Sequence, residues 1–403
     1  MRDPFSFADE LGPAKIIHVY EPACQLKGVL VVDNVAAGPA IGGLRMAPDV
    51  STEECFRLAR SMTLKNAAAG LPHGGGKSVI FGDPKIPTRD KERLLRTFAS
   101  ALRGVEDYIF GPDMGITEEC MAWVRDEIGR AIGLPREIGG IPLDEIGATG
   151  WGVLRATEIA LEHRKLQFSG LRFVVQGFGA VGKHAARFLA EKGSILVGAA
   201  DSRGAVYDAN GIDVSRLIEL KLEGGSVADW PTGEKVANTK AVEMECDLLI
   251  PAARPDAINT ENVERVATKI IVPGANIAIT ADAECYLHEK GILCIPDFIA
   301  NAGGVICAAI EYQGAPESTV FSVIDDKIGR NTQTVLDDAE RRNILPRQAA
   351  SELAEARVRR AMQFRRNGVH PERGSLRETV PCRENGWPFL SPDRRAREIE
   401  CDT

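Results

Sequence analysis

The chain has 403 residues, of which 44% are hydrophobic and 26% charged, and it carries a net charge of −8. This composition is typical of a globular protein long enough for two domains. The acidic balance argues against a nucleic-acid partner, and no apolar run is long enough to predict a membrane span. The nine cysteines lack zinc-ligand spacing and the N-terminal sequence lacks a signal-peptide core, so we expect no metal and a cytoplasmic location.

The N-terminal part combines β-rich runs with glycine-dense motifs. Residues 14–21 and 28–35 predict two strands of a first sheet. The motif GPAIGGLRM follows and is interpreted as a glycine-dense turn. In this turn Ile41, Gly42 and Gly43 either approach a ligand closely or simply connect two strands.

An amphipathic helix is predicted over residues 51–66. Ser51 and Glu54 fit a capping box, and apolar residues follow at helical spacing. Lys65 falls on the apolar face, where its ammonium group either reaches water or holds an anion in a cleft. The motif GLPHGGGK comes next and predicts a loop whose three glycines bring the backbone, and Lys77 with it, close to a partner.

A second candidate position for chemistry is Asp113, in the motif GPDMG. It comes directly after an apolar strand, and loops at strand ends often carry functional residues. Aspartate is also a good turn former, so this position by itself leaves both interpretations open.

The clearest local motif is GFGAVG, from Gly177 to Gly182. It lies between a predicted strand at 171–176 and an amphipathic helix that ends at Gly193. The next strand ends at Asp201, close to the spacing expected for an acid that binds the ribose of a dinucleotide. The free N–H groups at the start of the helix suit a pyrophosphate. The pattern therefore predicts dinucleotide binding.

Strands and helices continue to alternate after this motif. Strands are predicted within residues 246–253, 269–276 and 291–305, with a helix after each of the first two. Such alternation favours a doubly wound parallel sheet, in which ligands bind beyond the carboxyl ends of the strands. Asn276 and Asn301 lie at such ends.

Eight motifs together resemble one family. GPAIGGLRM, MTLKNAAAGLPHGGGK, GPDMG, ATGWG, GFGAVG, LIPAA, PGAN and NAGGV occur, within residues 14–330, in the order seen in the glutamate/leucine/phenylalanine/valine dehydrogenases. The resemblance implies an α/β fold of two domains, an α/β substrate-binding domain at 1–147 and a doubly wound Rossmann domain at 148–330. C-terminal helices, predicted within 331–403, would pack back on the first domain. The implied protein is a homo-oligomer that converts an L-amino acid to a 2-oxo acid and ammonia.

The resemblance also implies roles for individual residues. Lys77 matches the catalytic lysine, Asp113 the proton-transfer acid and Lys65 the lysine that holds the substrate carboxylate. A lysine with a lowered pKa can activate the water that attacks the imine. The other substrate-binding positions implied are Ile41, Gly42, Gly43, Gly111, Asn301, Val305 and Ala308. The cofactor-binding positions implied are Thr149, Gly177, Phe178, Gly179, Ala180, Val181, Gly182, Asp201, Ser202, Ala252, Asn276 and Asn301.

Two of these positions bear on the choice of substrate. Glutamate enzymes of the family carry a lysine before Gly-Gly-Leu-Arg and a serine after Asn-Ala-Gly-Gly, which hold the side-chain carboxylate; here the positions are Ile41 and Ala308. A carboxylate buried there without a partner would cost several kcal/mol, so we expect a branched-chain or aromatic L-amino acid. Glutamate stays an alternative because GPDMG and ATGWG are closer to the glutamate branch.

Two further questions concern the cofactor and catalysis. Asp201 should accept a hydrogen bond from a ribose 2′-OH and repel a 2′-phosphate, which favours NAD. Arg203 could instead accept a phosphate, so NADP stays open. A non-catalytic, NAD-binding regulatory subunit is disfavoured, because Lys65, Lys77 and Asp113 are all present.

Overall fold

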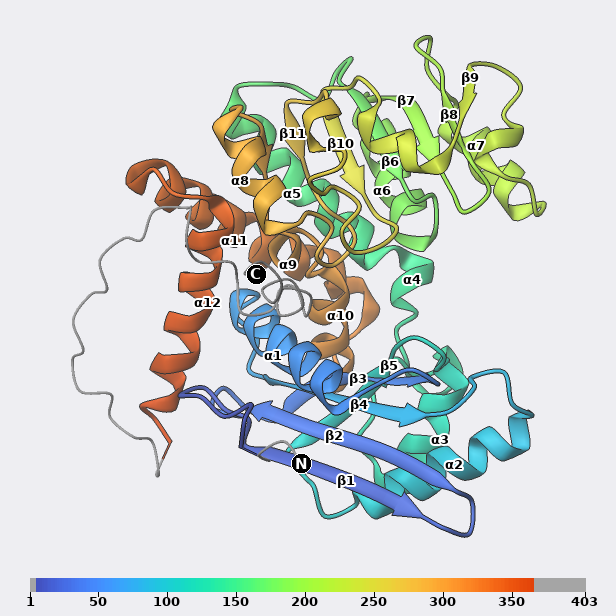
Figure 1. The fold of residues 1–403 in the computed structure, drawn as a ribbon, viewed down its shortest axis with the longest axis vertical. Coiled ribbons are helices and arrows are strands. Elements are labelled where there is room, and N and C mark those ends of the chain that lie inside the picture. The colour runs from blue at the N-terminus through green and yellow to red at the C-terminus, as the bar shows by residue number, and fades with distance from the viewer. Residues whose placement is uncertain (1–4, 366–403) are drawn as a thin grey trace, which may run out of the picture.

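The computed structural model describes residues 5–365, which form two lobes (Figure 1). The lower lobe is built on a five-stranded sheet and the upper lobe on a seven-stranded sheet. The predicted α/β fold with a Rossmann-type second domain is confirmed. Within the described residues, no helix is long and apolar enough to cross a membrane.

The sheet of the lower lobe mixes antiparallel and parallel pairs. Its strands, in spatial order, are β1 (Lys15–Glu21), β2 (Leu26–Asn34), β4 (Gly74–Phe81), β3 (Ala40–Ala47) and β5 (Tyr108–Pro112). β1, β2 and β4 pair antiparallel, whereas β4, β3 and β5 run parallel. The carboxyl ends of these three parallel strands therefore meet at one edge of the sheet.

Two glycine-rich segments that we expected to be turns are strands instead. GPAIGGLRM contributes β3, and the three glycines before Lys77 begin β4. A Cβ added at Gly42 would lie only 1.8 Å from the carbonyl oxygen of Gly76, and one added at Gly76 would lie 2.7 Å from the Tyr108 ring. The glycines are needed for close approach within the sheet, a use that sequence cannot separate from a turn.

Helices cover both faces of this sheet. α1 (Thr52–Ala68) lies on the face towards the upper lobe, and α2 (Thr88–Ala101) and α3 (Glu118–Ile128) lie on the other. Successive residues of β2 point to opposite faces of the sheet. Leu30 and Val32 pack towards α2 and α3, whereas Val29 and Val31 pack against α1.

The sheet of the upper lobe is the predicted doubly wound one. Its spatial order is β12 (Leu293–Cys294), β11 (Ile270–Ile271), β10 (Leu248–Pro251), β6 (Arg172–Gln176), β7 (Ile195–Ala200), β8 (Ala205–Tyr207) and β9 (Glu234–Val236). The strands from β12 to β7 are parallel, and β8 and β9 add an antiparallel edge. The helices of this lobe are α4 (Leu143–Ile146), α5 (Ala148–Arg164), α6 (Ala180–Glu191), α7 (Val214–Leu222) and α8 (Ala281–Glu289).

The helix expected between residues 253 and 269 is absent. Only a 3-10 turn, Val263–Arg265, forms there. Asn259 accepts a hydrogen bond from the backbone of Glu261, and Asn262 accepts one from the backbone of Asn259. Asparagine side chains that bond nearby backbone groups in this way compete with a helix.

The C-terminal helices are α9 (Asp297–Ala300), α10 (Gly303–Tyr312), α11 (Val320–Arg342) and α12 (Pro346–Met362). α12 packs back on α1 of the lower lobe, as expected, whereas α11 packs mainly on α5 of the upper lobe. Lys327 donates to the carbonyl oxygen of Gly70 at 2.9 Å and Arg357 to that of Ala68 at 2.6 Å. Both cations satisfy carbonyls at or just beyond the carboxyl end of α1, where the helix dipole favours positive charge.

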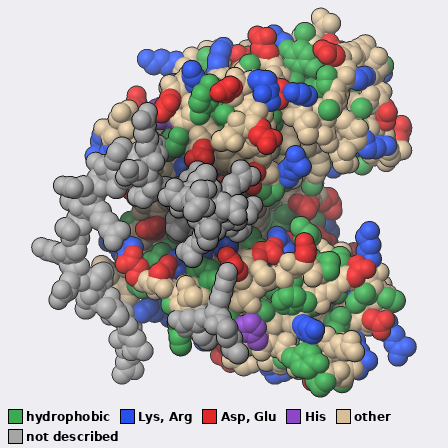
Figure 2. All heavy atoms as spheres, in the orientation of Figure 1, with side chains coloured by type: hydrophobic (Ala, Val, Ile, Leu, Met, Phe, Trp, Pro, Cys, Tyr) green, Lys and Arg blue, Asp and Glu red, His purple; other side chains and the backbone are tan. Residues whose placement is uncertain are grey.

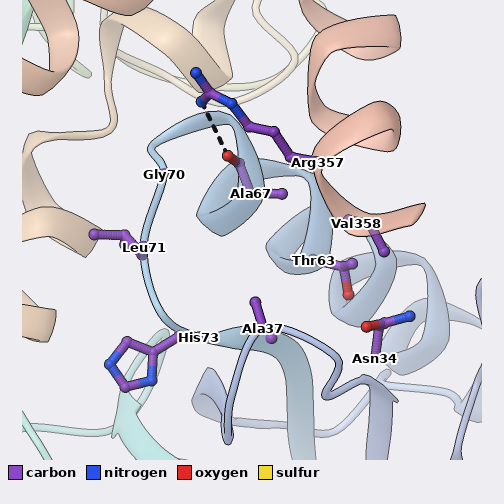
Figure 3. A pocket seen from close by; sticks show the side chains of 10 residues that line it. Asn34, Ala37, Thr63, Ala67, Gly70, Leu71, His73, Arg357 and Val358 are labelled. Atoms are coloured by element: carbon purple, nitrogen blue, oxygen red, sulfur yellow. Dashed lines mark hydrogen bonds between the residues drawn. The ribbon is translucent and has the colours of Figure 1, made fainter. Parts of the chain in front are cut away.

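Figure 3 shows this end of α1, with Arg357 reaching the carbonyl oxygen of Ala67 beside a cavity of about 240 Å³. The segment after residue 365 lies outside the described residues, and the domain limits at 147/148 and 330/331 stay predictions.

Candidate active site

The structure brings the two predicted catalytic side chains into contact. Lys77 lies on β4 two residues before Val79, which packs against α1, so Lys77 points to the same face. Asp113 follows β5 at the carboxyl edge of the sheet. The ammonium group of Lys77 donates to Oδ2 of Asp113. A Cβ added at Gly43 would lie 2.9 Å from Cβ of Asp113, so the glycine makes room for this carboxylate.

Arg45 is a member of the site that sequence reasoning missed. Its Nη2 donates to Oδ1 of Asp113 at 3.3 Å, and its Nη1 donates to Glu54 at 2.5 Å. The carboxylate of Asp113 is therefore held between two cations, one on each oxygen. Arg45 lies two residues after Gly43, so in a strand both residues face the same side of the sheet as Asp113. Arg45 could therefore have been predicted if β3 had been recognised as a strand.

The environment of Lys77 favours its neutral form. Burial lowers the pKa of Lys77 to about 7, and the positive charges of Arg45 and Lys65 act in the same direction. The carboxylate of Asp113 opposes this shift because it favours the ammonium form. The amine of Lys77 can therefore lose its proton near neutral pH while it stays in contact with the carboxylate of Asp113.

Lys65 extends from α1 towards the upper lobe. Its amine donates to Oδ1 of Asn276 at 3.3 Å, and Asn301 donates to the same oxygen at 2.9 Å. Burial lowers the pKa of Lys65 to about 8, against the opposing charge of Asp297. The sequence left open whether the amine of Lys65 reaches water or lies in a cleft. In the structure the amine lies between the two lobes.

A cleft separates the lobes at this point. Figure 2 shows the surface hollowed between the lobes. A cavity of about 320 Å³ lies between α1 and the upper lobe, and Leu64 and Asn276 are among the residues that line it. This cavity is lined by α1, the upper lobe and the C-terminal helices, and Lys77, Asp113 and the glycine motif are not among its lining residues.

The two positions expected to select the substrate, Ile41 and Ala308, belong to one small cluster. Ile109 and Ile132 complete it, and all four side chains are between 0% and 6% exposed. A Cβ added at Gly111 would lie 3.3 Å from Cδ1 of Ile132, so Gly111 leaves space beside the cluster. The four side chains that form this cluster are all aliphatic.

Ile132 gave no signal in the sequence. It lies in a loop that runs beside β5, where its N–H donates to the carbonyl oxygen of Phe110 at 2.8 Å. The same loop is held from α10 by Glu311, which accepts hydrogen bonds from the N–H groups of Leu134 and Ile141 at 3.2 and 3.0 Å. Val305, in contrast, packs against the core of the upper lobe.

The glycine motif has the geometry of a pyrophosphate cradle. Gly177 has a φ of 104°, which favours glycine, and a Cβ added at Gly182 would lie 2.0 Å from the carbonyl oxygen of Gly177. Gly179 precedes α6 without any side-chain cap, and a Cβ added there would meet nothing within 4 Å. The start of α6 therefore offers backbone donors to an open space, which fits a dinucleotide.

The other predicted cofactor positions lie around this cradle. Ala252 donates its N–H to Gln176 at 2.7 Å, at the carboxyl ends of β10 and β6. Thr149 lies at the start of α5, beside Gly304. A Cβ added at Gly304 would lie 3.0 Å from the hydroxyl oxygen of Thr149. Phe178 is buried, whereas Gly179, Ala180 and Ser202 are exposed and Val181 is partly buried.

Asp201 lies beside the cradle, but its carboxylate is already engaged. The N–H of Phe178 donates to Ala200 at 2.7 Å, which places the end of β7 against the glycine motif. Hydrogen bonds outweigh the effect of burial and lower the pKa of Asp201 to about 2. The four donors are the amine of Lys221 at 2.6 Å, the hydroxyl of Ser226 at 2.8 Å, and the backbone N–H groups of Arg203 at 2.9 Å and Val227 at 3.0 Å.

Comparisons with known proteins agree with this architecture. A family model described as Glu/Leu/Phe/Val dehydrogenase, dimerisation domain, matches residues 17–130, and one described as Glutamate/Leucine/Phenylalanine/Valine dehydrogenase matches residues 139–366. A glutamate dehydrogenase of Aeropyrum pernix is 38% identical over 82% of this chain and 85% of its own length. A glutamate dehydrogenase of Thermotoga maritima is 37% identical over 85% of this chain and 87% of its own length.

Two solved structures share the fold. The hetero-hexameric glutamate dehydrogenase of Thermus thermophilus, in a leucine-bound form, superposes with a TM-score of 0.79 at 30% identity, over 89% of this chain and 91% of that one. The L-tryptophan dehydrogenase of Nostoc punctiforme superposes with a TM-score of 0.69 at 25% identity, over 87% of this chain and 97% of that one.

The fold and the comparisons define the class of protein as an oxidoreductase that acts on the CH–NH₂ group of its donor. The chain belongs to the glutamate/leucine/phenylalanine/valine dehydrogenase family, as the eight motifs indicated. It is an amino acid dehydrogenase, and members of this family use NAD or NADP as the hydride acceptor.

Proposed function

We propose that this protein catalyses the reversible oxidative deamination of an apolar L-amino acid, branched-chain or aromatic, to a 2-oxo acid and ammonia. The observation that carries the proposal is the aliphatic cluster of Ile41, Ile109, Ile132 and Ala308. Ile41 lies on β3 two residues before Gly43, which abuts Asp113. A substrate held at the Lys77–Asp113 pair would therefore direct its side chain at this cluster.

The cluster discriminates by the cost of desolvation. A leucine or phenylalanine side chain gains about 1.5–3 kcal/mol when it is fully buried. A glutamate carboxylate in the same place would lose its hydration without a cation to receive it, at a cost of several kcal/mol. The two effects act in the same direction and favour apolar substrates.

The proposed roles of the polar residues come from the family resemblance, and the contacts described above are compatible with them. Lys65 binds the substrate α-carboxylate, and Asn276 and Asn301 orient the substrate at the upper lobe. The glycine cradle between β6 and α6 holds the dinucleotide. When the dinucleotide is bound, its nicotinamide accepts the hydride from Cα of the substrate. The neutral amine of Lys77 then takes a proton from the water that attacks the imine carbon. Asp113 passes a proton to the departing amine, which leaves as ammonia.

Two further proposals concern assembly and the alternative substrate. The dimerisation-domain match and the hetero-hexameric neighbour support an oligomer, and we propose that it is built from copies of this chain. Glutamate is the second candidate substrate because relatives at 36–38% identity are named glutamate dehydrogenases. Glutamate as substrate would require a cation beside the cluster.

The test is a panel of L-amino acids at alkaline pH with NAD and, separately, with NADP, followed by absorbance of the reduced cofactor. We expect the highest kcat/KM with leucine, valine, isoleucine, phenylalanine or tryptophan. Highest kcat/KM with glutamate would replace the proposal by its alternative. No turnover with any amino acid, together with retained dinucleotide binding, would indicate a regulatory subunit instead.

A further inference from the structure

The carboxylate of Asp201 has no capacity left for a ribose hydroxyl. A carboxylate offers about four lone-pair positions, and four donors from Lys221, Ser226, Arg203 and Val227 already use them. The side chain of Asp201 is only 8% exposed. A cofactor with an unphosphorylated ribose would have to break one of these bonds before Asp201 could bind it.

Two cations, Lys221 and Arg203, lie at this position, together with the carboxylates of Asp201 and of Asp229, which accepts from the N–H of Ser226. The ammonium group of Lys221 neutralises Asp201, so the acid no longer presents an uncompensated charge against a phosphate. Only one of the three donors of an ammonium group is needed for the bond to Asp201, and the side chain of Lys221 is 23% exposed. Arg203 adds a second cation, whose Nη2 donates to the carbonyl oxygen of Gly224 at 2.8 Å.

The exposed residues beside this pair complete a phosphate-binding arrangement. Ser202 and Arg203 directly follow Asp201 and are both exposed. Lys221 lies at the end of α7, and Gly224 is in the turn just after it. Two cations and a hydroxyl thus lie near the end of β7, which is beside the glycine motif, where the adenosine ribose of a dinucleotide lies in this class of fold.

We propose that Lys221, Arg203 and Ser202 form a site for the 2′-phosphate of NADP, and that Asp201 positions Lys221 instead of binding an unphosphorylated ribose. The proposal rests on the dinucleotide site proposed above. It reverses the preference for NAD that the spacing of Asp201 favours in the sequence. Lys221 is the residue that decides the preference, because without it the carboxylate would repel the phosphate.

The experiment is calorimetric titration of the full-length protein with adenosine 2′,5′-bisphosphate and with adenosine 5′-monophosphate. We expect the bisphosphate to bind at least about tenfold more tightly, as for charge-assisted hydrogen bonds. Lys221→Met should remove this advantage and leave the affinity for the monophosphate within about twofold. Lys240→Met is the matched control, since Lys240 is an exposed lysine of the same lobe that pairs with Glu243; it should change neither affinity.

Two more variants keep the test independent of folding, because Lys221→Met leaves a nearly buried carboxylate without its cation. Arg203→Ala, at an exposed position, should weaken only the bisphosphate. Asp201→Asn should leave the monophosphate within about twofold. A loss of monophosphate affinity in Asp201→Asn would overturn the proposal, because it would show that Asp201 holds the ribose.

The remaining outcomes separate this proposal from the proposed function. Equal affinities in the parent protein, or a tighter monophosphate, would overturn the 2′-phosphate site alone. Binding of neither nucleotide would overturn both this site and the dinucleotide cradle. Tighter binding of the bisphosphate with no oxidation of any amino acid would support the phosphate site and refute the proposed reaction.

Discussion

Introducing a lysine at Ile41 tests how the substrate side chain is selected. Ile41 is 3% exposed and contacts an aliphatic cluster, so Ile41→Lys places an ammonium group where a glutamate carboxylate would end. Two opposite charges about 4 Å apart gain about 4 kcal/mol at an effective dielectric constant near 20. The ratio of kcat/KM for glutamate over leucine should therefore rise by about 10³. Adding Ala308→Ser supplies a hydroxyl donor and should raise the ratio further.

The assay compares L-glutamate and L-leucine at a saturating concentration of the preferred cofactor. Ile41→Met is the matched control, because it keeps an apolar side chain of similar volume, and its ratio should stay within about tenfold of the parent. Circular dichroism checks that the buried lysine is tolerated. The reasoning is refuted if the parent already prefers glutamate to every apolar amino acid, since the carboxylate would then meet a different cation.

Three further predictions concern the catalytic pair. Lys77→Met should lower kcat by about 10²–10⁴ while the affinity for adenosine nucleotides is retained, and Asp113→Asn should behave likewise in the same kinetic and calorimetric assays. In the parent, log kcat should rise with pH through about 7, because the catalytic amine must lose its proton and the pKa of Lys77 is about 7. Arg45→Gln removes a charge that lowers this pKa, so the rise should move to higher pH, and Arg45→Lys should move it back.

Each of these predictions has a contrary result. Turnover of Lys77→Met within about tenfold of the parent would remove Lys77 from the role of general base. If log kcat does not change between pH 6 and 8, a range of about one unit on each side of the pKa of Lys77, a group other than Lys77 limits the rate. An unchanged profile in Arg45→Gln, with lowered kcat alone, would leave Arg45 only the task of orienting Asp113.

The sequence alone predicted the upper lobe better than the lower one. Strand–helix alternation is a local pattern, and the glycine motif with Asp201 could be placed from spacing. In the lower lobe, Gly42 and Gly76 indicated turns, because a glycine that allows two strands to approach closely looks the same in sequence as one that reverses the chain.

The site was predictable only as far as motifs and resemblance reach. Resemblance implied catalytic roles for Lys77 and for Asp113, and the structure places the two side chains in contact. Ile132 and Lys221 were missed because their importance comes from contacts with residues distant in the chain. Lys221 lies 20 residues from its partner Asp201, and no periodicity or motif connects the two.

Half of the proposed specificity cluster lies on parts of the chain separate from the reactive groups. Lys77 and Asp113 belong to β4 and to the end of β5, and Ile41 and Ile109 lie on β3 and β5 of the same sheet, whereas Ile132 comes from a loop and Ala308 from α10. A lineage could therefore exchange the loop or the helix residue and acquire a new substrate while its reactive groups stayed in place. Glu311 sets a limit to this freedom, because it ties the loop to α10. A substitution that shifts the backbone of the loop would also shift α10, and the reverse holds as well. A change of substrate preference should therefore favour paired substitutions in the loop and in α10.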